Sequence, residues 1–335
     1  MSDSIPRISV VVPAFQASAT IERCLAALAH QSLPREQYEV VVVDDGSSDD
    51  TANRARRCGA RVVRLPRNQG PAQARNAGLA ASRGEIVVFT DSDCEPTSGF
   101  LDALTAPLRD ACIAATKGTY ESNQRGLVSR FVQLEYETRY RHTATASNVD
   151  FIDTYAACYR RVDLVRLGGF DPRLRVCEDQ ELSFRLAEAG LNMRFVPDAR
   201  TYHQHADTLW DYVRKKFRIA RWKAAVLRKH PHRAIHDSHT PQTLKLQIVS
   251  TYAVCATAAL LAQHHRSRRA WLALAIALGV HVSLTAEFVL RSASRDPAVA
   301  VAAPAILFCR DLALGAGLGV GLLQNAGQLR QLRQG

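Results

Sequence analysis

The first 115 residues alternate between short β-branched runs and segments in which apolar residues recur at helical spacing. The β-branched runs are typical of strands buried on both faces of a parallel sheet, and they lie at 8–15, 39–44, 61–65 and 85–90. Helical spacing fills the intervals, at 18–31, 49–58 and 71–82. Because strands joined by single helices need right-handed crossovers, this pattern predicts an α/β fold with a doubly wound sheet.

A less regular pattern continues to the end of the predicted first domain, which we place at 1–205. Further elements are expected as a helix at 127–142, a strand at 151–159, a helix at 178–190 and a strand at 193–196. Gly190 is a helix-ending residue, and Pro197 is expected to stop the final strand because it cannot donate a ladder hydrogen bond.

From residue 244 onward Ala, Leu and Val predominate and charges are few. Candidate membrane spans within this tail, 244–325, lie at 246–262, 270–290 and 298–323. The second and third are long enough to cross a bilayer of about 30 Å, whereas the first is marginal, so the tail is predicted to span two or three times. The alternative is a helical hairpin packed on the first domain. Arg310 and Asp311, inside the third segment, are expected to pair or face protein.

Positive charge gathers just before this tail. The chain of 335 residues has a formal net charge of +11, and nine Lys or Arg residues with one acidic residue lie between Asp211 and Arg233. Trp210 and Trp222 are among the aromatic residues interleaved with them. Basic and aromatic residues beside a membrane segment favour an anionic lipid surface over nucleic acid, so 206–243 is interpreted as an amphipathic interfacial segment.

The eight cysteines include no CxxC pair and no zinc-ligand spacing. The N-terminus has no signal-peptide pattern. Both features predict reduced thiols in a cytoplasmic first domain, attached to a multi-pass tail in the cell membrane. Three spans would place the basic segment 264–269 outside, against the positive-inside tendency, unless the first segment re-enters or lies in the interface.

Carboxylates follow two of the predicted strands. Asp91 and Asp93 come directly after the fourth strand, where alternate side chains point the same way, so they can converge on a Mg²⁺ or Mn²⁺ ion held by a diphosphate. Asp44 and Asp45 end the second strand, next to Gly46, and can accept hydrogen bonds from a base or a ribose. In doubly wound sheets, ligands bind beyond these strand ends. The alternative for Asp91 and Asp93 is a solvated turn, and the alternative for the residues after Asp45 is that Ser48 or Asp49 caps the next helix.

Two helix starts add further candidates. Arg75, near the start of one helix, could reach a diphosphate or a core carboxylate. Glu178 and Asp179 open another helix, where acidic residues also complement the helix dipole. With a reference pKa near 3.9, Asp179 is expected to be ionised at neutral pH and able to act as a general base.

Taken together, these segments resemble glycosyltransferase family 2. The blocks that carry the resemblance, in family order, are VVPAF (11–15), VVDDGSSDDT (42–51), RNQGPAQARNAGL (67–79), TDSD (90–93), GGFDP (168–172) and EDQELSFRLAEAG (178–190). The resemblance implies the A-type glycosyltransferase fold, a doubly wound mixed sheet, and an inverting single displacement. It also implies a nucleotide-diphosphate sugar donor, with UDP-sugars the first expectation, and a lipid-linked or amphiphilic acceptor.

The same resemblance implies individual roles. Asp44 and Asp45 would bind the nucleoside, Asp91 the ribose side of the donor and Asp93 the metal, while Asp179 would be the catalytic base beside Glu178.

Other positions follow from the same blocks and from the region beyond them. Pro13 and Phe15 would line the donor site, and His203 would complete the metal shell. Arg221 and Trp222 belong to a segment that resembles the Q/R-x-x-R-W motif of membrane-bound members and would contact the diphosphate. The alternative for His203 is a polar loop, and the alternative for Arg221 and Trp222 is a lipid-facing basic helix.

Two rival functions use the same fold. A sugar-phosphate nucleotidyltransferase usually carries a glycine- and lysine- or arginine-rich loop after its first strand, and this chain has Pro13-Ala14-Phe15-Gln16 instead. A catalytically silent membrane module is the second rival, and the intact Asp93 and Asp179 speak against it.

Overall fold

The computed structural model describes residues 5–234 and 242–332, with the backbone alone described for 325–332. The chain forms two compact units. The sheet unit comprises Met1–Asn123 and Arg139–Gln204, and the helical unit comprises Gln124–Thr138 and His205–Gly335. The chain passes between the units three times, after residues 123, 138 and 204, so the helical unit also includes Gln124–Thr138, which composition did not indicate. The domain limits expected from the sequence stay predictions.

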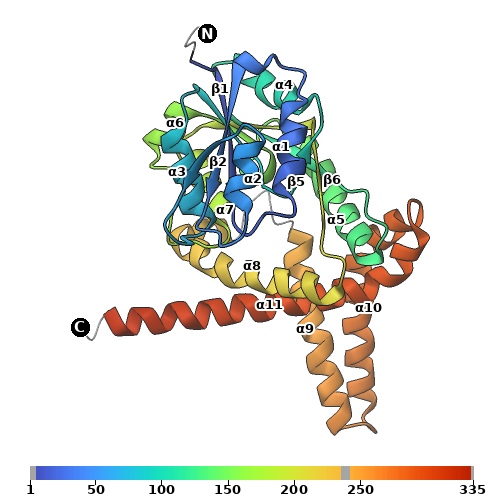
Figure 1. Cartoon of the computed structure of the whole chain (residues 1–335). Helices are drawn as coiled ribbons and strands as arrows, with labels where there is room; N and C mark the ends of the chain where they lie inside the picture. The colour runs from blue at the N-terminus through green and yellow to red at the C-terminus, as the bar shows by residue number, and fades with distance from the viewer. Residues whose placement is uncertain (1–4, 235–241, 333–335) are drawn as a thin grey trace. The chain divides into compact units, whose positions relative to one another are not determined.

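An eight-stranded mixed sheet forms the centre of the sheet unit (Figure 1), in the order β3-β2-β1-β4-β7-β6-β8-β5. The strands are β1 (Ile8–Ala14), β2 (Tyr38–Asp44), β3 (Arg61–Arg64), β4 (Ile86–Phe89), β5 (Cys94–Pro96), β6 (Ile113–Glu121), β7 (Ala157–Arg160) and β8 (Asn192–His203). The first four are parallel to one another, as their separation by helices predicts. β7 then pairs antiparallel with both β4 and β6, which makes the sheet mixed.

Helices alternate with the first strands and continue beyond them. Those of the sheet unit are α1 (Ile21–Ala29), α2 (Thr51–Arg57), α3 (Pro71–Ala81), α4 (Phe100–Thr105), α6 (Arg161–Arg166) and α7 (Glu178–Glu188). α5 (Leu127–Ala144) begins in the helical unit and ends in the sheet unit. The side chains of Val10, Val42 and Phe89 are fully buried in the core that the sheet forms with its helices. Burial on both faces explains why these strands are continuous β-branched runs.

The last strand differs from its prediction, because β8 runs through Pro197 to His203 instead of stopping at 196. Its pairing with β6 changes register between Lys117 and Thr119, so that the strand bulges around the proline. A bulge leaves a residue unpaired, and this relieves the missing N–H of Pro197. The longer strand has a functional consequence, since it carries His203 alongside β5.

The helical unit contains the apolar tail. Its helices are α8 (Leu209–Lys229), α9 (Gln242–Gln263), α10 (Arg268–Ala293) and α11 (Pro297–Leu332). In the described part of the chain, three segments are long and apolar enough to cross a membrane, at Gln242–Gln263, Arg268–Ala293 and Pro297–Gln324. The expectation for Arg310 and Asp311 is confirmed, because both are buried in protein and hydrogen-bonded to each other at 2.8 Å.

Candidate active site

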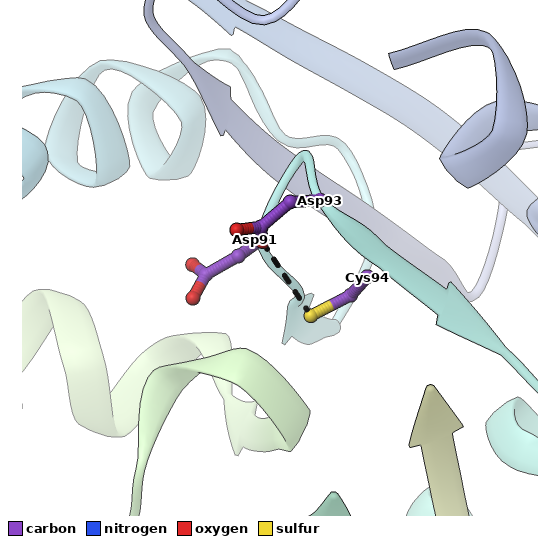
Figure 2. A group of neighbouring side chains, drawn as sticks. All are labelled: Asp91, Asp93 and Cys94. Carbon is purple, nitrogen blue, oxygen red and sulfur yellow. Dashed lines mark hydrogen bonds between the residues drawn. The ribbon is translucent and has the colours of Figure 1, made fainter. Parts of the chain in front are cut away.

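Asp91 and Asp93 occupy the turn between β4 and β5, and their carboxylates lie close together there (Figure 2). Ligand atoms of Asp91, Asp93 and Cys94 all fall within 4.8 Å of one another. Nε2 of His203 stands 3.5 Å from Oδ2 of Asp93, because His203 is the β8 partner of Cys94 on β5. The structure therefore brings together the three residues that the sequence proposed for the donor metal and its neighbourhood.

The side chains that could bind a metal here fit a hard divalent cation. The carboxylates of Asp91 and Asp93 are 33% and 46% exposed, so an ion and a diphosphate can reach them from solvent. Cys94 is a poor ligand, because burial and the nearby charges of Asp91 and Asp93 raise the pKa of its thiol well above the usual value. Two carboxylates and one imidazole, with remaining positions for phosphate oxygens and water, suit Mg²⁺ or Mn²⁺.

An aromatic stack holds His203 in place. The imidazole stacks on the ring of Tyr120, with centroids 4.4 Å apart, and Tyr120 stacks on Tyr155 at 3.4 Å. The hydroxyl of Tyr140 lies 2.6 Å from that of Tyr155 and accepts a hydrogen bond from the backbone N–H of Tyr120 at 2.8 Å. Sequence patterns gave no sign of these tyrosines, since they come from three separate segments and share no motif.

Arg75 links the carboxylates of the turn to those of α7. It donates a hydrogen bond to Oδ1 of Asp91 at 2.9 Å and another, very short, to Oε1 of Glu178. Burial alone would lower the pKa of Arg75, but the charges of Asp91 and Glu178 raise it, so the guanidinium stays charged. α3 approaches the sheet closely enough for this contact because residue 78 is glycine: a Cβ there would stand 2.2 Å from Cγ1 of Val11. Of the two partners proposed for Arg75, the structure shows the core carboxylates.

Asp179 opens α7 in an unusual electrostatic setting. The preceding residue, Cys177, adopts a left-handed conformation (φ 65°), a strained one for a side chain with a Cβ, as the N-cap of the helix. Asp179 keeps partial contact with solvent, but its burial, followed by the charges of Glu178 and Asp153, raises its pKa to about 8. The expectation of an aspartate ionised throughout the neutral range is therefore wrong for this environment.

The charge of Asp153, which helps to raise the pKa of Asp179, belongs to a buried ion pair. Lys117, on β6, is 2% exposed and donates a hydrogen bond to Oδ2 of Asp153 at 2.6 Å. The segment that carries Asp153 is tied to α7, because the backbone N–H of Ile152 donates to the hydroxyl of Ser183 at 3.0 Å. The single lysine inside the apolar run of β6 was the available signal for this pair, since a buried ammonium needs a partner.

Asp44 and Asp45 occupy the end of β2 and organise the neighbouring loops. Asp45 accepts hydrogen bonds from the backbone N–H groups of Gln69 and Gly70, each at 2.8 Å, and burial raises its pKa. Oδ2 of Asp44 is buried 3.1 Å from Nε of Arg64 and has no hydrogen-bond partner within the described residues. Both carboxylates are therefore buried and held by the protein, Asp45 by the loop at Gln69 and Gly70 and Asp44 by Arg64, and their binding to the nucleoside stays a prediction.

The remaining candidates are distributed between the two units. Pro13 lies in β1, paired with Val43 of β2, and Phe15 follows it with 47% of its surface exposed. Arg221 and Trp222 lie on α8 in the helical unit, where Nε of Arg221 donates to Oε1 of a glutamine on α11, at 2.8 Å. The donor-binding roles of all four residues stay predictions.

The sheet order and the carboxylate turn after β4 define a fold class, which a solved structure shares. A mannosyltransferase from Pyrobaculum calidifontis, solved with GDP-Man and Mn²⁺, superposes with a TM-score of 0.59 at 23% sequence identity. The match covers 96% of this chain and 88% of that one. The chain therefore has the A-type glycosyltransferase fold.

The family follows from sequence. Residues 9–167 match the model of glycosyl transferase family 2, and the chain belongs to this family. The pre-mycofactocin glycosyltransferase of Mycobacterium tuberculosis is 31% identical over 235 residues, which are 67% of this chain and 48% of that protein. The glycosyltransferase AglE of Haloferax volcanii is 26% identical over 231 residues, 68% of this chain and 76% of that protein. This chain thus spans about half the length of the mycobacterial relative.

Proposed function

We propose that this protein transfers a sugar from a nucleotide-diphosphate donor to a hydroxyl group of a lipid-linked or amphiphilic acceptor, by an inverting single displacement. The observation that carries the proposal is the arrangement in the sheet unit: Asp93 and His203 on one side of Asp91, and Arg75 connecting Asp91 to the start of α7, where Asp179 lies. Arg75 thus connects the candidate metal turn to Glu178, the residue directly before the candidate base.

The donor half of the reaction uses the ends of β2 and β4. Asp44 and Asp45 would form the nucleoside end of the site at the end of β2, and Asp91 and Asp93 would hold the diphosphate together with its cation, with His203 as an additional ligand. A Mg²⁺ or Mn²⁺ ion held by these residues would offset the charge that develops on the departing diphosphate. UDP-sugars are the first donors to test, followed by GDP- and dTDP-sugars.

The acceptor half of the reaction needs a base. Asp179 takes the proton of the acceptor hydroxyl as its oxygen attacks the anomeric carbon of the sugar, and the bond to the diphosphate breaks in the same step. A carboxyl with a pKa of about 8 is a stronger base than an ordinary aspartate once it is ionised. No covalent intermediate with the protein is required.

The acceptor class follows from the tail. Three helices that are long and apolar enough to cross a membrane, following a basic segment, support a membrane-attached enzyme whose catalytic domain, Met1–His205, works on the cytoplasmic side. An acceptor with a lipid or amphiphilic anchor would be concentrated at that surface.

The first test of the donor site is Asp93→Ala. We expect Mn²⁺-dependent donor binding to weaken at least about 100-fold, because a direct metal ligand matters more than the surrounding residues that orient such ligands. Isothermal titration of full-length protein in detergent with UDP, GDP and dTDP, each with and without Mn²⁺, measures this directly.

Asp102→Ala is the matched control, since Asp102 is an exposed carboxylate on α4 in the same unit. It is expected to bind the nucleotide like the wild type. Nucleotide binding by Asp93→Ala that stayed equally tight and equally metal-dependent would remove Asp93 from the metal site.

The pH dependence of transfer provides a second test. Because a base acts in its ionised form and the pKa of Asp179 is about 8, we expect kcat/KM to rise with pH from 6 to 8. Asp153→Asn removes one of the charges that raise this pKa, so the rise should move to lower pH. If Asp153→Asn kept wild-type donor affinity but left the pH profile unchanged, the group that titrates in the profile would not be Asp179.

A further inference from the structure

His203 is the last residue of β8, and neighbouring strand holds its backbone on one side. Its partner is Cys94, the first residue of β5, a strand of three residues at the edge of the sheet. On the other side, the pairing of β8 with β6 ends at Tyr202, one residue earlier. A histidine side chain also rotates about two bonds unless its surroundings select one rotamer. The strand pairing therefore places His203 near Asp93 without fixing the direction of its imidazole.

The ring of Tyr120 supplies that constraint. It lies against the imidazole of His203, with an angle of 29° between the two ring planes. Tyr120 is 5% exposed and the side chain of His203 is 8% exposed, so both rings are enclosed by protein. In this orientation Nε2 of His203 is the ring atom that lies 3.5 Å from Oδ2 of Asp93. The stack thus selects an orientation in which His203 and Asp93 can share one metal ion.

A second tyrosine supports Tyr120. The centroid of the Tyr155 ring lies 3.4 Å from that of Tyr120, with 14° between the ring planes. Two rings this close to Tyr120 would overlap if they shared one of its faces, so Tyr120 lies between Tyr155 and His203. Tyr155 belongs to the short 3₁₀ turn η3 (Thr154–Ala156) and is 5% exposed. The three rings therefore form a buried column with Tyr155 at its base.

The turn that carries Tyr155 is fixed on two sides. Asp153, the residue before η3, accepts a hydrogen bond from Nζ of Lys117 on β6 at 2.6 Å. The backbone N–H of Ile152 donates to the hydroxyl of Ser183 on α7 at 3.0 Å. These contacts lie on opposite sides of the ring column from His203 and involve neither His203 nor Asp93. The base of the column is therefore anchored to a strand and a helix of the sheet unit.

We propose that Tyr120 and Tyr155 are positioning residues for the donor metal, because their stacked rings hold the imidazole of His203 with Nε2 directed to the ion beside Asp93. This inference rests on the metal site proposed above. Neither tyrosine binds the ion itself. A ligand held in one orientation loses less conformational freedom on binding, so the column strengthens metal binding without adding a ligand. Residues that orient a metal-binding histidine typically contribute about 10- to 100-fold to metal affinity.

Tyr155→Leu tests the proposal, because it removes the base of the column and leaves His203 in the chain. We expect the Mn²⁺-dependent affinity for nucleotide to fall about 10-fold. Isothermal titration of the full-length protein in detergent with UDP, GDP and dTDP, each with and without Mn²⁺, measures it. Tyr155→Phe keeps the ring and should bind like the wild type. Tyr202→Leu is the matched control, since Tyr202 is 39% exposed and its side chain points to the opposite face from that of His203.

Two measurements distinguish positioning of His203 from a general disturbance of the fold. In a His203→Ala background, Tyr155→Leu should cause no further loss of Mn²⁺-dependent affinity, because the side chain that it positions is gone. Pulsed electron paramagnetic resonance of bound Mn²⁺ should detect an imidazole nitrogen in the wild type and in Tyr202→Leu. We expect that nitrogen signal to weaken in Tyr155→Leu and to be lost in His203→Ala.

Three results would overturn the positioning role. These are wild-type affinity in Tyr155→Leu, a loss of the same size with and without His203, and an equal loss in Tyr155→Phe, which keeps the ring. A wild-type protein whose nucleotide binding did not depend on Mn²⁺ would instead overturn the proposed metal site on which this inference rests.

Discussion

Asp179→Asn is expected to lower kcat for sugar transfer by about 10³-fold while leaving nucleotide affinity within about twofold of wild type. Asparagine keeps the shape of the side chain and its hydrogen bond with the backbone N–H of Gln180, at 2.8 Å, but cannot accept a proton from an acceptor hydroxyl. The rate is measured as the release of nucleotide from the donor that the binding screen identifies. Asp198→Asn, the same exchange at an exposed position of β8, is the control.

The same substitution has an expected effect on stability that a structural role alone would not produce. The pKa of Asp179 is raised on folding, so the native state binds this proton more tightly than the unfolded state, and stability falls as pH rises from about 4 to about 8. Asparagine removes that penalty. We therefore expect the melting temperature of Asp179→Asn at pH 8 to be equal to or above that of wild type. A variant that lost both activity and stability would indicate a structural aspartate instead of a base.

Sequence pattern predicted the parallel half of the fold closely, for a physical reason. Strands buried on both faces, such as β1 and β2, must be continuous apolar runs, and carboxylates placed directly after them must lie at one edge of the sheet. The positions of Asp91 and Asp93 could therefore be inferred from the chain alone. The antiparallel half was less predictable, because β8 is irregular and passes through Pro197.

The contacts that set the chemistry of the site could not be predicted in the same way. Arg75 joins Glu178, 103 positions away in sequence, and Asp153 joins Lys117, 36 positions away. Such pairs depend on how helices and strands stack, which local periodicity does not encode. The raised pKa of Asp179 follows from that stacking, since it reflects burial and the charges of Glu178 and Asp153. The reference pKa of aspartate therefore led to a role for Asp179 as a base, but it did not predict that the pKa is raised to about 8.

Arg75→Met is expected to be the most destabilising single substitution proposed for the sheet unit. Arg75 is 5% exposed and is hydrogen-bonded to Asp91 and Glu178, so methionine would leave two neighbouring carboxylates without their shared cation. Breaking a buried ion pair in this way costs about 3–5 kcal/mol. For a unit of this size, that corresponds to a fall in melting temperature of about 10 °C, measured on the full-length protein in detergent at pH 7.

Charge repulsion, and not lost packing, is the reason for that expected fall, and the two can be separated. Arg75→Met/Glu178→Gln removes one of the stranded carboxylates and should recover much of the lost stability. Arg83→Met, an exposed position two residues beyond α3, controls for the exchange itself. If the second substitution restored no stability, Arg75 would act through packing alone. Its proposed coupling of the metal turn to α7 would then have no electrostatic basis.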